Sequence, residues 1–227
     1  MDTLCRDTAE VLGVDACVLR RCHGRLNRLH FAPGGILYDF DEDFHGIYVV
    51  IDGIAKTVLL VNESEVVTGI ATRSDVLGSD ALHSPTFVTR AVAVTPLTVV
   101  RVPVDVLSEL LRGSRSFRAA LYFRLGTAIA ESLDLIKLLA RARSEARIAF
   151  FLLKFASKLA EGPAAKRAFN IGLSREEIGC YLGLTVETVS RKLTALAETG
   201  YVKVSGRQIR INNWKGLERI RSKKSLH

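Results

Sequence analysis

An acid, a hydroxyl and a guanidinium lie close together in LTVETVSRKL, the stretch from residue 184 to 193. On a helix, side chains four positions apart share one side, and this spacing separates the polar groups from the apolar Val189 and Leu193. An arginine can donate to O6 and N7 of guanine, a glutamate can accept from the amino group of cytosine, and a small apolar side chain can touch a thymine methyl group. The pattern predicts a face that reads base edges, and an ordinary solvated face is the alternative. The candidate base-reading residues are Val186, Glu187, Ser190 and Arg191.

Cap residues around this stretch predict two short helices joined by a tight corner. Ser174 and Glu177 form a capping box at the start of the first helix, and Gly183 ends it. Thr185 then caps the second helix, which ends at Gly200. The predicted face therefore lies in the first half of the second helix.

The segments around the two helices complete a recognisable motif. Two short strands are expected around Ser205 and Gly206, and residues 163–172 are expected to form a loop. Helix, corner, helix and hairpin indicate a winged helix-turn-helix, whose second helix enters the major groove of DNA. Candidate contacts to DNA phosphates are Arg175, Thr185, Lys192, Lys203 and Arg207.

The net charge of +8 is concentrated in the C-terminal part of the chain. Residues 1–140 hold 14 Lys and Arg against 17 Asp and Glu, whereas residues 141–227 hold 18 against 7. This asymmetry favours a polyanionic partner such as double-stranded DNA, although a basic soluble domain would show it too. No apolar run reaches the roughly 18 residues of a membrane span, and the acidic start lacks the layout of a secretory signal, so we expect a cytoplasmic protein without a membrane partner.

The segment LSREEIGCYLGLTVETVSRKLTALAETGYVKV resembles the DNA-binding part of the Crp/Fnr family of bacterial transcription regulators, and its VETVSR core is closest to the Fnr/FixK-like branch. The resemblance extends over nearly the whole chain. It implies a homodimer on a palindrome close to TTGAT-N4-ATCAA, with Glu187, Ser190 and Arg191 reading each half-site. It also implies that residues 74–88 touch RNA polymerase.

The fold class expected from the sequence is α+β, with an antiparallel β-roll in front of the helical part. Val-rich runs flank Asp52 and Gly53 in 46–61, which predicts a hairpin, and another such run at 86–103 is broken at Pro96. Short strands at this spacing indicate a jelly roll like that of cyclic-nucleotide-binding domains. The expected domains are a helical lead-in at 1–28, the β-roll sensor domain at 29–113, a dimerisation helix at 114–141 and the winged helix-turn-helix at 142–227.

The predicted long helix has two apolar sides. A second stripe at Ile129, Leu133 and Ile136 accompanies a seam with coiled-coil spacing, so we expect one side to pack on the roll and the other on a second copy of the chain. Burial wholly within one chain is the alternative. The residues assigned to the dimer interface are Leu121, Leu125, Ala128, Ser132, Leu135 and Leu139.

The signal that controls the protein is left open by the sequence. Cyclic-nucleotide-binding members of the family carry a glutamate for the ribose and an Arg-Ser/Thr-Ala motif for the phosphate. Here the corresponding stretches read Gly78-Ser79-Asp80 and Arg90-Ala91-Val92. Arg90 is able to meet a phosphate, but the ribose acceptor is missing, which argues against cyclic AMP.

Iron is a second alternative for the signal, which would make the protein oxygen-linked. Oxygen-sensing relatives hold a [4Fe–4S] cluster with N-terminal cysteines spaced C-x2-C-x5-C and a fourth cysteine near the end of the roll. Cys5, Cys17 and Cys22 have a different spacing, and Val100 stands near the fourth position, so the four ligands of a cluster are not evident. Haem has no specific support, and its candidate ligands are His23, His30, His45 and His83.

Cys180 is a candidate redox site on the first helix of the predicted motif. Since Ile178 and Leu182 face inward, the helical rotation places Cys180 on the outer side, where an oxidised thiol would clash with DNA phosphates. An incidental surface thiol is the favoured interpretation, because Arg175 alone is weak support for a lowered thiol pKa.

Two classes of protein remain after the motifs are compared. A DNA-binding transcription regulator accounts for most features, and the alternative is a small-molecule sensor whose winged domain contacts other proteins. We do not expect an enzyme, because no P-loop, G-x-S-x-G or H-E-x-x-H motif is present.

Overall fold

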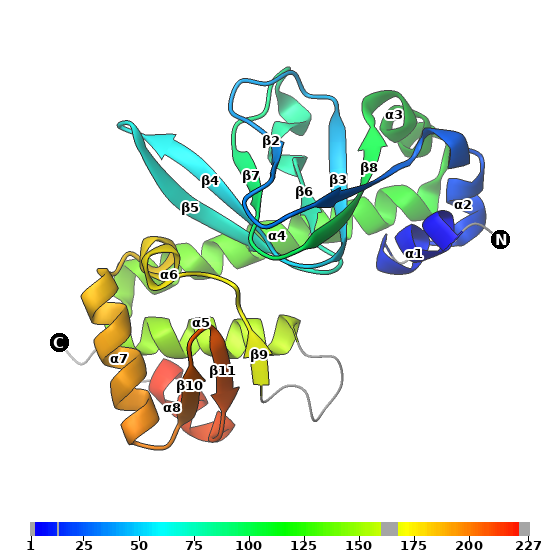
Figure 1. Ribbon diagram of the computed structural model, residues 1–227. Coiled ribbons are helices and arrows are strands. Elements are labelled where there is room, and N and C mark those ends of the chain that lie inside the picture. Colours follow the sequence, from blue (N-terminus) through cyan, green and yellow to red (C-terminus); the bar gives the residue numbers. More distant parts are fainter. Residues whose placement is uncertain (1–2, 13, 160–167, 223–227) are drawn as a thin grey trace. The chain divides into compact units, whose positions relative to one another are not determined.

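The computed structural model describes residues 3–12, 14–159 and 168–222. The chain separates into two compact units, residues 1–130 and 131–227, and each is described by itself. The boundary falls within the long helix α4 (Arg115–Arg141), so the C-terminal turns of this helix belong to the second unit (Figure 1). No helix in the described ranges is both long and apolar enough to cross a membrane.

Two antiparallel four-stranded sheets build the roll in the N-terminal unit, with strand orders β1-β8-β3-β6 and β2-β7-β4-β5 (Figure 1). Tyr38, Tyr48 and Phe87 lie in the apolar core that side chains from both sheets share. The opposite face of the first sheet is covered by the N-terminal helices and α3, which explains why β3 is apolar at nearly every position. The strands are β1 (Asn27–Phe31), β2 (Ile36–Tyr38), β3 (Gly46–Asp52), β4 (Ala55–Val61), β5 (Ser64–Ala71), β6 (Val76–Leu77), β7 (Arg90–Ala93) and β8 (Leu97–Pro103), and the 3-10 helix η2 (Ser79–His83) follows β6.

The hairpin predicted around Asp52 and Gly53 is wrong. β3 pairs with β8 and β6, whereas β4 pairs with β5 and β7 in the other sheet. Gly53 has a φ of 92°, and a Cβ there would lie 2.3 Å from the carbonyl oxygen of Pro96. The glycine therefore forms a corner at which the chain passes from one sheet to the other.

The N-terminal lead-in is helical, as predicted, and contains α1 (Thr3–Leu12), α2 (Ala16–Arg20) and the 3-10 helix η1 (His23–Arg25). It packs on the outer face of the first sheet, where Cys5 and Cys22 are part of the apolar core. Pro103 immediately precedes α3 (Val104–Gly113), which confirms the predicted helix start.

The apolar seam assigned to α4 is wrong at its first residue, Leu121. Leu121 is 3% exposed and packs in the core of its own roll, so it is not available to a partner, and Leu125 is partly buried beside it. Of the other assigned residues, Ala128, Ser132 and Leu139 are exposed, and Leu135 is half-buried. The large apolar side chains that α4 leaves exposed are mostly other residues, because the roll covers the start of the leucine side. They are Tyr122, Phe123, Ile129, Leu133, Ile136 and Leu139.

The C-terminal unit packs three helices and a small sheet around α5. The expected loop at 163–172 is wrong at residues 168–170, which form β9 and pair with β11, whereas residues 171 and 172 are loop; residues 160–167 lie outside the described part. The final helix α8 was not anticipated and packs on α5. The elements are α5 (Ser144–Lys158), β9 (Ala168–Asn170), α6 (Arg175–Leu182), α7 (Val186–Glu198), β10 (Val202–Ser205), β11 (Gln208–Ile211) and α8 (Trp214–Ser222).

Candidate nucleic-acid interface

Helices α6 and α7 meet at a tight corner that local hydrogen bonds define. The Ser174 Oγ accepts from the Glu177 backbone N–H at 3.1 Å, and the Glu177 carboxylate accepts from the Ser174 backbone N–H at 2.7 Å, so the predicted capping box is present. Gly183 ends α6 in the left-handed region with a φ of 60°. Gly179 is equally constrained, because a Cβ there would lie 2.5 Å from the carbonyl oxygen of Leu184. The corner therefore fixes where α7 begins.

Helix α7 has two chemically different sides. Val189, Leu193 and Leu196 are 0%, 3% and 2% exposed and hold the helix on the core of the unit. The opposite side of its first two turns is exposed, as the spacing predicts. The exposed side chains there are Val186, Glu187, Ser190 and Arg191.

The first turn of α7 prepares Glu187 to accept hydrogen bonds. Thr185 caps the helix, and its hydroxyl accepts from the Thr188 backbone N–H at 3.2 Å. The pKa of Glu187 lies below its ordinary value because its own backbone N–H and the Thr185 hydroxyl stabilise the carboxylate. An ionised carboxylate is an acceptor only, which suits the amino group of a cytosine.

The phosphate candidates are placed differently from one another. The guanidinium of Arg175 donates to the carbonyl of Gly206 at 3.2 Å, so it ties α6 to the tip of the wing formed by β10 and β11. Burial lowers the pKa of this guanidinium. Thr185 is committed to capping, Lys192 is half-buried, and Arg207 is exposed at the wing tip.

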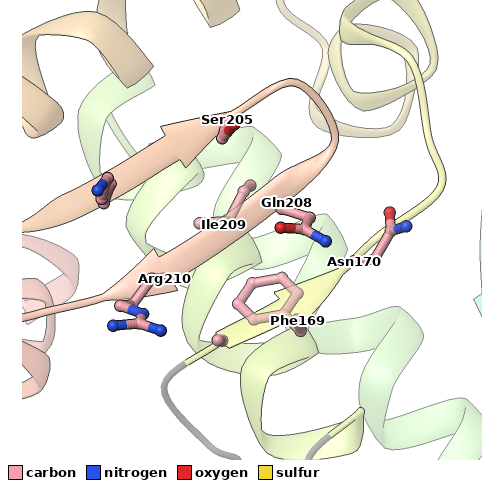
Figure 2. A pocket seen from close by; sticks show the side chains of 8 residues that line it. Phe169, Asn170, Ser205, Gln208, Ile209 and Arg210 are labelled. Atoms are coloured by element: carbon pink, nitrogen blue, oxygen red, sulfur yellow. The ribbon is translucent and has the colours of Figure 1, made fainter.

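Lys203 lies on the open face of the wing sheet, away from the tip. In the antiparallel register it stands directly opposite Arg210, and Ser205 stands opposite Gln208, which pairs on its other side with Asn170. These residues line a hollow of about 460 Å³, in which Arg210, Gln208 and Asn170 project from β11 and β9 (Figure 2). The described strands β9, β10 and β11 contain no acidic residue, so this face is cationic.

The structure also contains hydrogen bonds and ion pairs among α4, α5 and α6 that the sequence patterns did not reveal. Arg147, in the first turns of α5, donates hydrogen bonds to carbonyl groups at the end of α4 and at the end of α6. Glu131 on α4 pairs with Lys154 and Lys158 of α5 at 3.0 and 2.9 Å. The partners of Arg147 are backbone carbonyls, which any residue offers, and Glu131 lies more than twenty residues from its lysines, so periodicity and motif spacing carried no signal for these contacts.

Comparisons with known proteins agree with this architecture. A family model described as a Crp-like helix-turn-helix domain matches residues 146–220, and one described as a cyclic nucleotide-binding domain matches residues 28–114. The "Fumarate and nitrate reduction regulatory protein" of Escherichia coli (strain K12) is 29% identical over 191 residues, which cover 82% of this chain and 75% of that protein. The protein of the same name from Salmonella typhi is 29% identical over 184 residues, covering 79% and 72%.

Solved structures give the same result. FixK2 from Bradyrhizobium japonicum is 26% identical, with a TM-score of 0.79, and the match covers 88% of this chain and 99% of that one. A transcriptional regulator of the CRP/FNR family from Thermus thermophilus shares the fold, with a TM-score of 0.71 at 20% identity over 88% and 100% of the two chains. The chain belongs to the Crp/Fnr family. Within that family it is of the Fnr/FixK-like branch. It is a DNA-binding transcription regulator, and the relatives found are regulators rather than enzymes.

The roll of this Crp/Fnr protein does not fit a cyclic nucleotide, although its domain matches that description. Arg90, the phosphate candidate, donates to Asp39 at 2.6 Å and also pairs with Glu65, so two carboxylates already neutralise it. The Arg90 guanidinium holds the pKa of Asp39 below its ordinary value. Asp80, in the stretch where a ribose acceptor is expected, accepts a hydrogen bond from the Thr89 hydroxyl at 2.9 Å. An added phosphate would have to displace these carboxylates.

The N-terminal cysteines do not fit an iron–sulfur cluster either. Cys5 and Cys22 are buried in the apolar core, whereas Cys17 is exposed. A hydrogen bond with Asp15 raises the pKa of the Cys17 thiol, and burial raises that of Cys22. No group of three or more His, Cys, Asp or Glu side chains in the described ranges is placed to hold a metal ion.

Two of the haem candidates form hydrogen bonds within the N-terminal unit. His30 bonds Thr98, His45 bonds Tyr48 and the carbonyl of Asp43, and His83 is exposed, whereas the side chain of His23 lies outside the described part.

Cys180 is less exposed than the helical rotation suggested. Cys180 is half-buried, and it is not without an interaction partner. Ile178 and Leu182 are buried, as expected, but Gly179 and Tyr181 are buried too, so α6 is covered on more than one side and Cys180 is only partly exposed.

Proposed function

We propose that the protein binds DNA as a homodimer at a palindrome close to TTGAT-N4-ATCAA. In this proposal Arg191 donates to the guanine of each half-site, Glu187 accepts from a cytosine amino group, and Ser190 and Val186 complete the contact. The observation that carries it is that the first two turns of α7 have an exposed polar side, while the buried side of the helix packs on the core and fixes its orientation. A helix-turn-helix presents this part of its second helix to the major groove.

A dimer through α4 is supported by the apolar side chains that this helix leaves exposed. Ile129, Leu133 and Ile136 are 62%, 60% and 62% exposed and recur every three to four residues. Such a stripe is the usual seam between two parallel helices, and a two-fold arrangement would place two winged domains on the two halves of a palindrome.

Further contacts of the DNA complex follow from charge and exposure. Arg207 at the wing tip and Lys192 on α7 are the best-placed phosphate contacts; Arg175 lies near the wing tip, and Lys203 lies further along the wing sheet. Residues 74–88, where Leu82 and Val88 are 37% and 44% exposed, would contact RNA polymerase. The proposed location is the cytoplasm, where both partners are present.

The sequence specificity is tested by fluorescence anisotropy with purified protein. The wild type should prefer the palindrome to a scrambled duplex, and Arg191→Ala should cost about 1–3 kcal/mol and lose discrimination at the G·C position. Arg219→Ala is the matched control, because Arg219 is exposed on α8 and lies outside the proposed interface. If Arg191→Ala weakened binding to the consensus and scrambled duplexes equally, Arg191 would contact only phosphate.

A further inference from the structure

Arg147 closes the C-terminal end of α4. Its Nε donates to the carbonyl of Ala142 at 3.0 Å, and its Nη2 donates to the carbonyl of Leu139 at 2.9 Å. The last carbonyl groups of a helix have no partner within the helix, so a cation that binds them both satisfies acceptors and complements the helix dipole. Residues 142 and 143 alone connect α4 to α5, and this side chain spans that connection.

The same guanidinium closes the C-terminal end of α6. Its Nη1 donates to the carbonyl of Leu182 at 2.9 Å and to that of Gly183 at 3.2 Å. A Cβ on Gly183 would lie 3.3 Å from this nitrogen and 3.4 Å from Cδ2 of Leu139, so the helix-turn-helix corner approaches the end of α4 closely. One planar group thus joins two helix ends, and α7 begins just beyond one of them.

A second contact joins the same three helices. The carboxylate of Glu131 on α4 lies between the ammonium groups of Lys154 and Lys158 on α5. Lys154 also donates to the hydroxyl of Tyr181 on α6 at 3.3 Å. All of these atoms belong to the C-terminal unit, and so do the exposed Leu133 and Ile136 of α4. The recognition helix is therefore tied to the turns of α4 that carry part of the proposed dimer seam.

We infer that Arg147 is a positioning residue that sets the spacing and twist of the two recognition helices in the dimer, and so selects the length of the spacer between half-sites. The inference rests on the proposed dimer and palindrome. Two linked sites gain affinity only if both can be occupied at once, and half-site spacing is fixed by the protein's geometry. The four hydrogen bonds of Arg147 go to backbone carbonyls and not to the reading residues, so base recognition within one half-site does not require it.

The test compares Arg147→Met with wild type on four duplexes. Methionine keeps much of the side-chain length and removes all four hydrogen bonds. The duplexes are the palindrome with its four-base-pair spacer, versions one base pair shorter and one longer, and a single half-site. Arg219→Met, which removes an exposed arginine of the same unit, is the control. Wild type and control should favour one spacer by about a hundredfold, whereas Arg147→Met should reduce this preference to about threefold while its half-site affinity and base discrimination stay unchanged.

Two outcomes overturn the inference. An unchanged spacer preference in Arg147→Met would show that the hydrogen bonds of Arg147 do not position α7. A loss of base discrimination at the single half-site would show that Arg147 only maintains the fold of the corner. If Arg147→Met does not fold, Arg147→Lys is judged by the same criteria, because a lysine keeps the charge but cannot bridge both helix ends with a planar group.

A structural measurement separates this inference from the proposed function. In dimers of one labelled and one unlabelled protomer, spin labels at Lys137 on α4 and Thr194 on α7, both exposed, should give one narrow distance distribution in the wild type and a broad one in Arg147→Met. An unchanged distribution overturns the inference whether or not DNA binds. Wild-type protein that does not distinguish the palindrome from a scrambled duplex refutes the proposed function instead.

Discussion

Leu133→Ala should weaken the dimer without weakening the fold of the protomer. Leu133 is 60% exposed on α4, between Ile129 and Ile136, so little of its side chain is buried by its own chain. Substitutions of exposed side chains generally change the free energy of unfolding by less than about 0.5 kcal/mol. A larger effect on self-association therefore requires a second copy of the chain to cover this residue.

The size of the effect follows from the exposed fraction. Burying a whole leucine side chain contributes about 2.5 kcal/mol, so covering the exposed part of Leu133, which is 60% exposed, contributes about 1.5 kcal/mol per protomer. Alanine loses about three quarters of this, and the two-fold symmetry doubles it, which gives about 2 kcal/mol per dimer. The dimer dissociation constant should rise about thirtyfold.

Sedimentation equilibrium over a range of protein concentrations measures this constant. Leu60→Ala is the matched control, because Leu60 on β4 is 56% exposed but lies outside α4. Leu121→Ala supplies the contrast: Leu121 is 3% exposed in the core of the roll, so its loss should cost about 2–5 kcal/mol of folding free energy while the folded protein still dimerises. Equal dissociation constants for Leu133→Ala and Leu60→Ala would refute the assignment of the exposed stripe to the dimer.

Two further predictions concern charge. Arg207→Gln should reduce the slope of log K against log salt by about two for the dimer, since each protomer loses one phosphate contact, and binding titrations at several salt concentrations measure it; an unchanged slope would place the wing tip away from DNA. Burial alone would raise the pKa of Glu131, but Lys158 and then Lys154 more than offset it, so its pKa lies below the ordinary value. The stability from this carboxylate is therefore present above its unfolded pKa of about 4.3 and is lost as the pH falls through the lower folded value. Urea unfolding of wild type and Glu131→Gln should differ at neutral pH and converge in acid, and a constant difference would contradict the ion pairs.

The sequence by itself determined the helix-turn-helix corner and which side of α7 is exposed. Ser174, Glu177 and Thr185 cap helices through hydrogen bonds to residues within one turn, so their effect is local and visible in the sequence. The helical period likewise placed Val189 inside and Arg191 outside, since three buried positions on one side decide which way α7 faces.

Only the tertiary structure decided the features that depend on contacts between distant segments. Asp52 and Gly53 have the sequence of a hairpin, yet β3 and β4 join different sheets, because β3 pairs with β8, β4 pairs with β5, and Gly53 packs against the backbone of Pro96. Leu121 has the spacing of the dimer seam, but the roll of its own chain buries it. No sequence pattern indicated the hydrogen bonds of Arg147 or the ion pairs of Arg90, because the fold brings the carbonyl and carboxylate partners to them. Local hydrogen bonds and periodicity depend on neighbouring residues, whereas pairing, burial and these contacts depend on which surfaces the folded chain brings together.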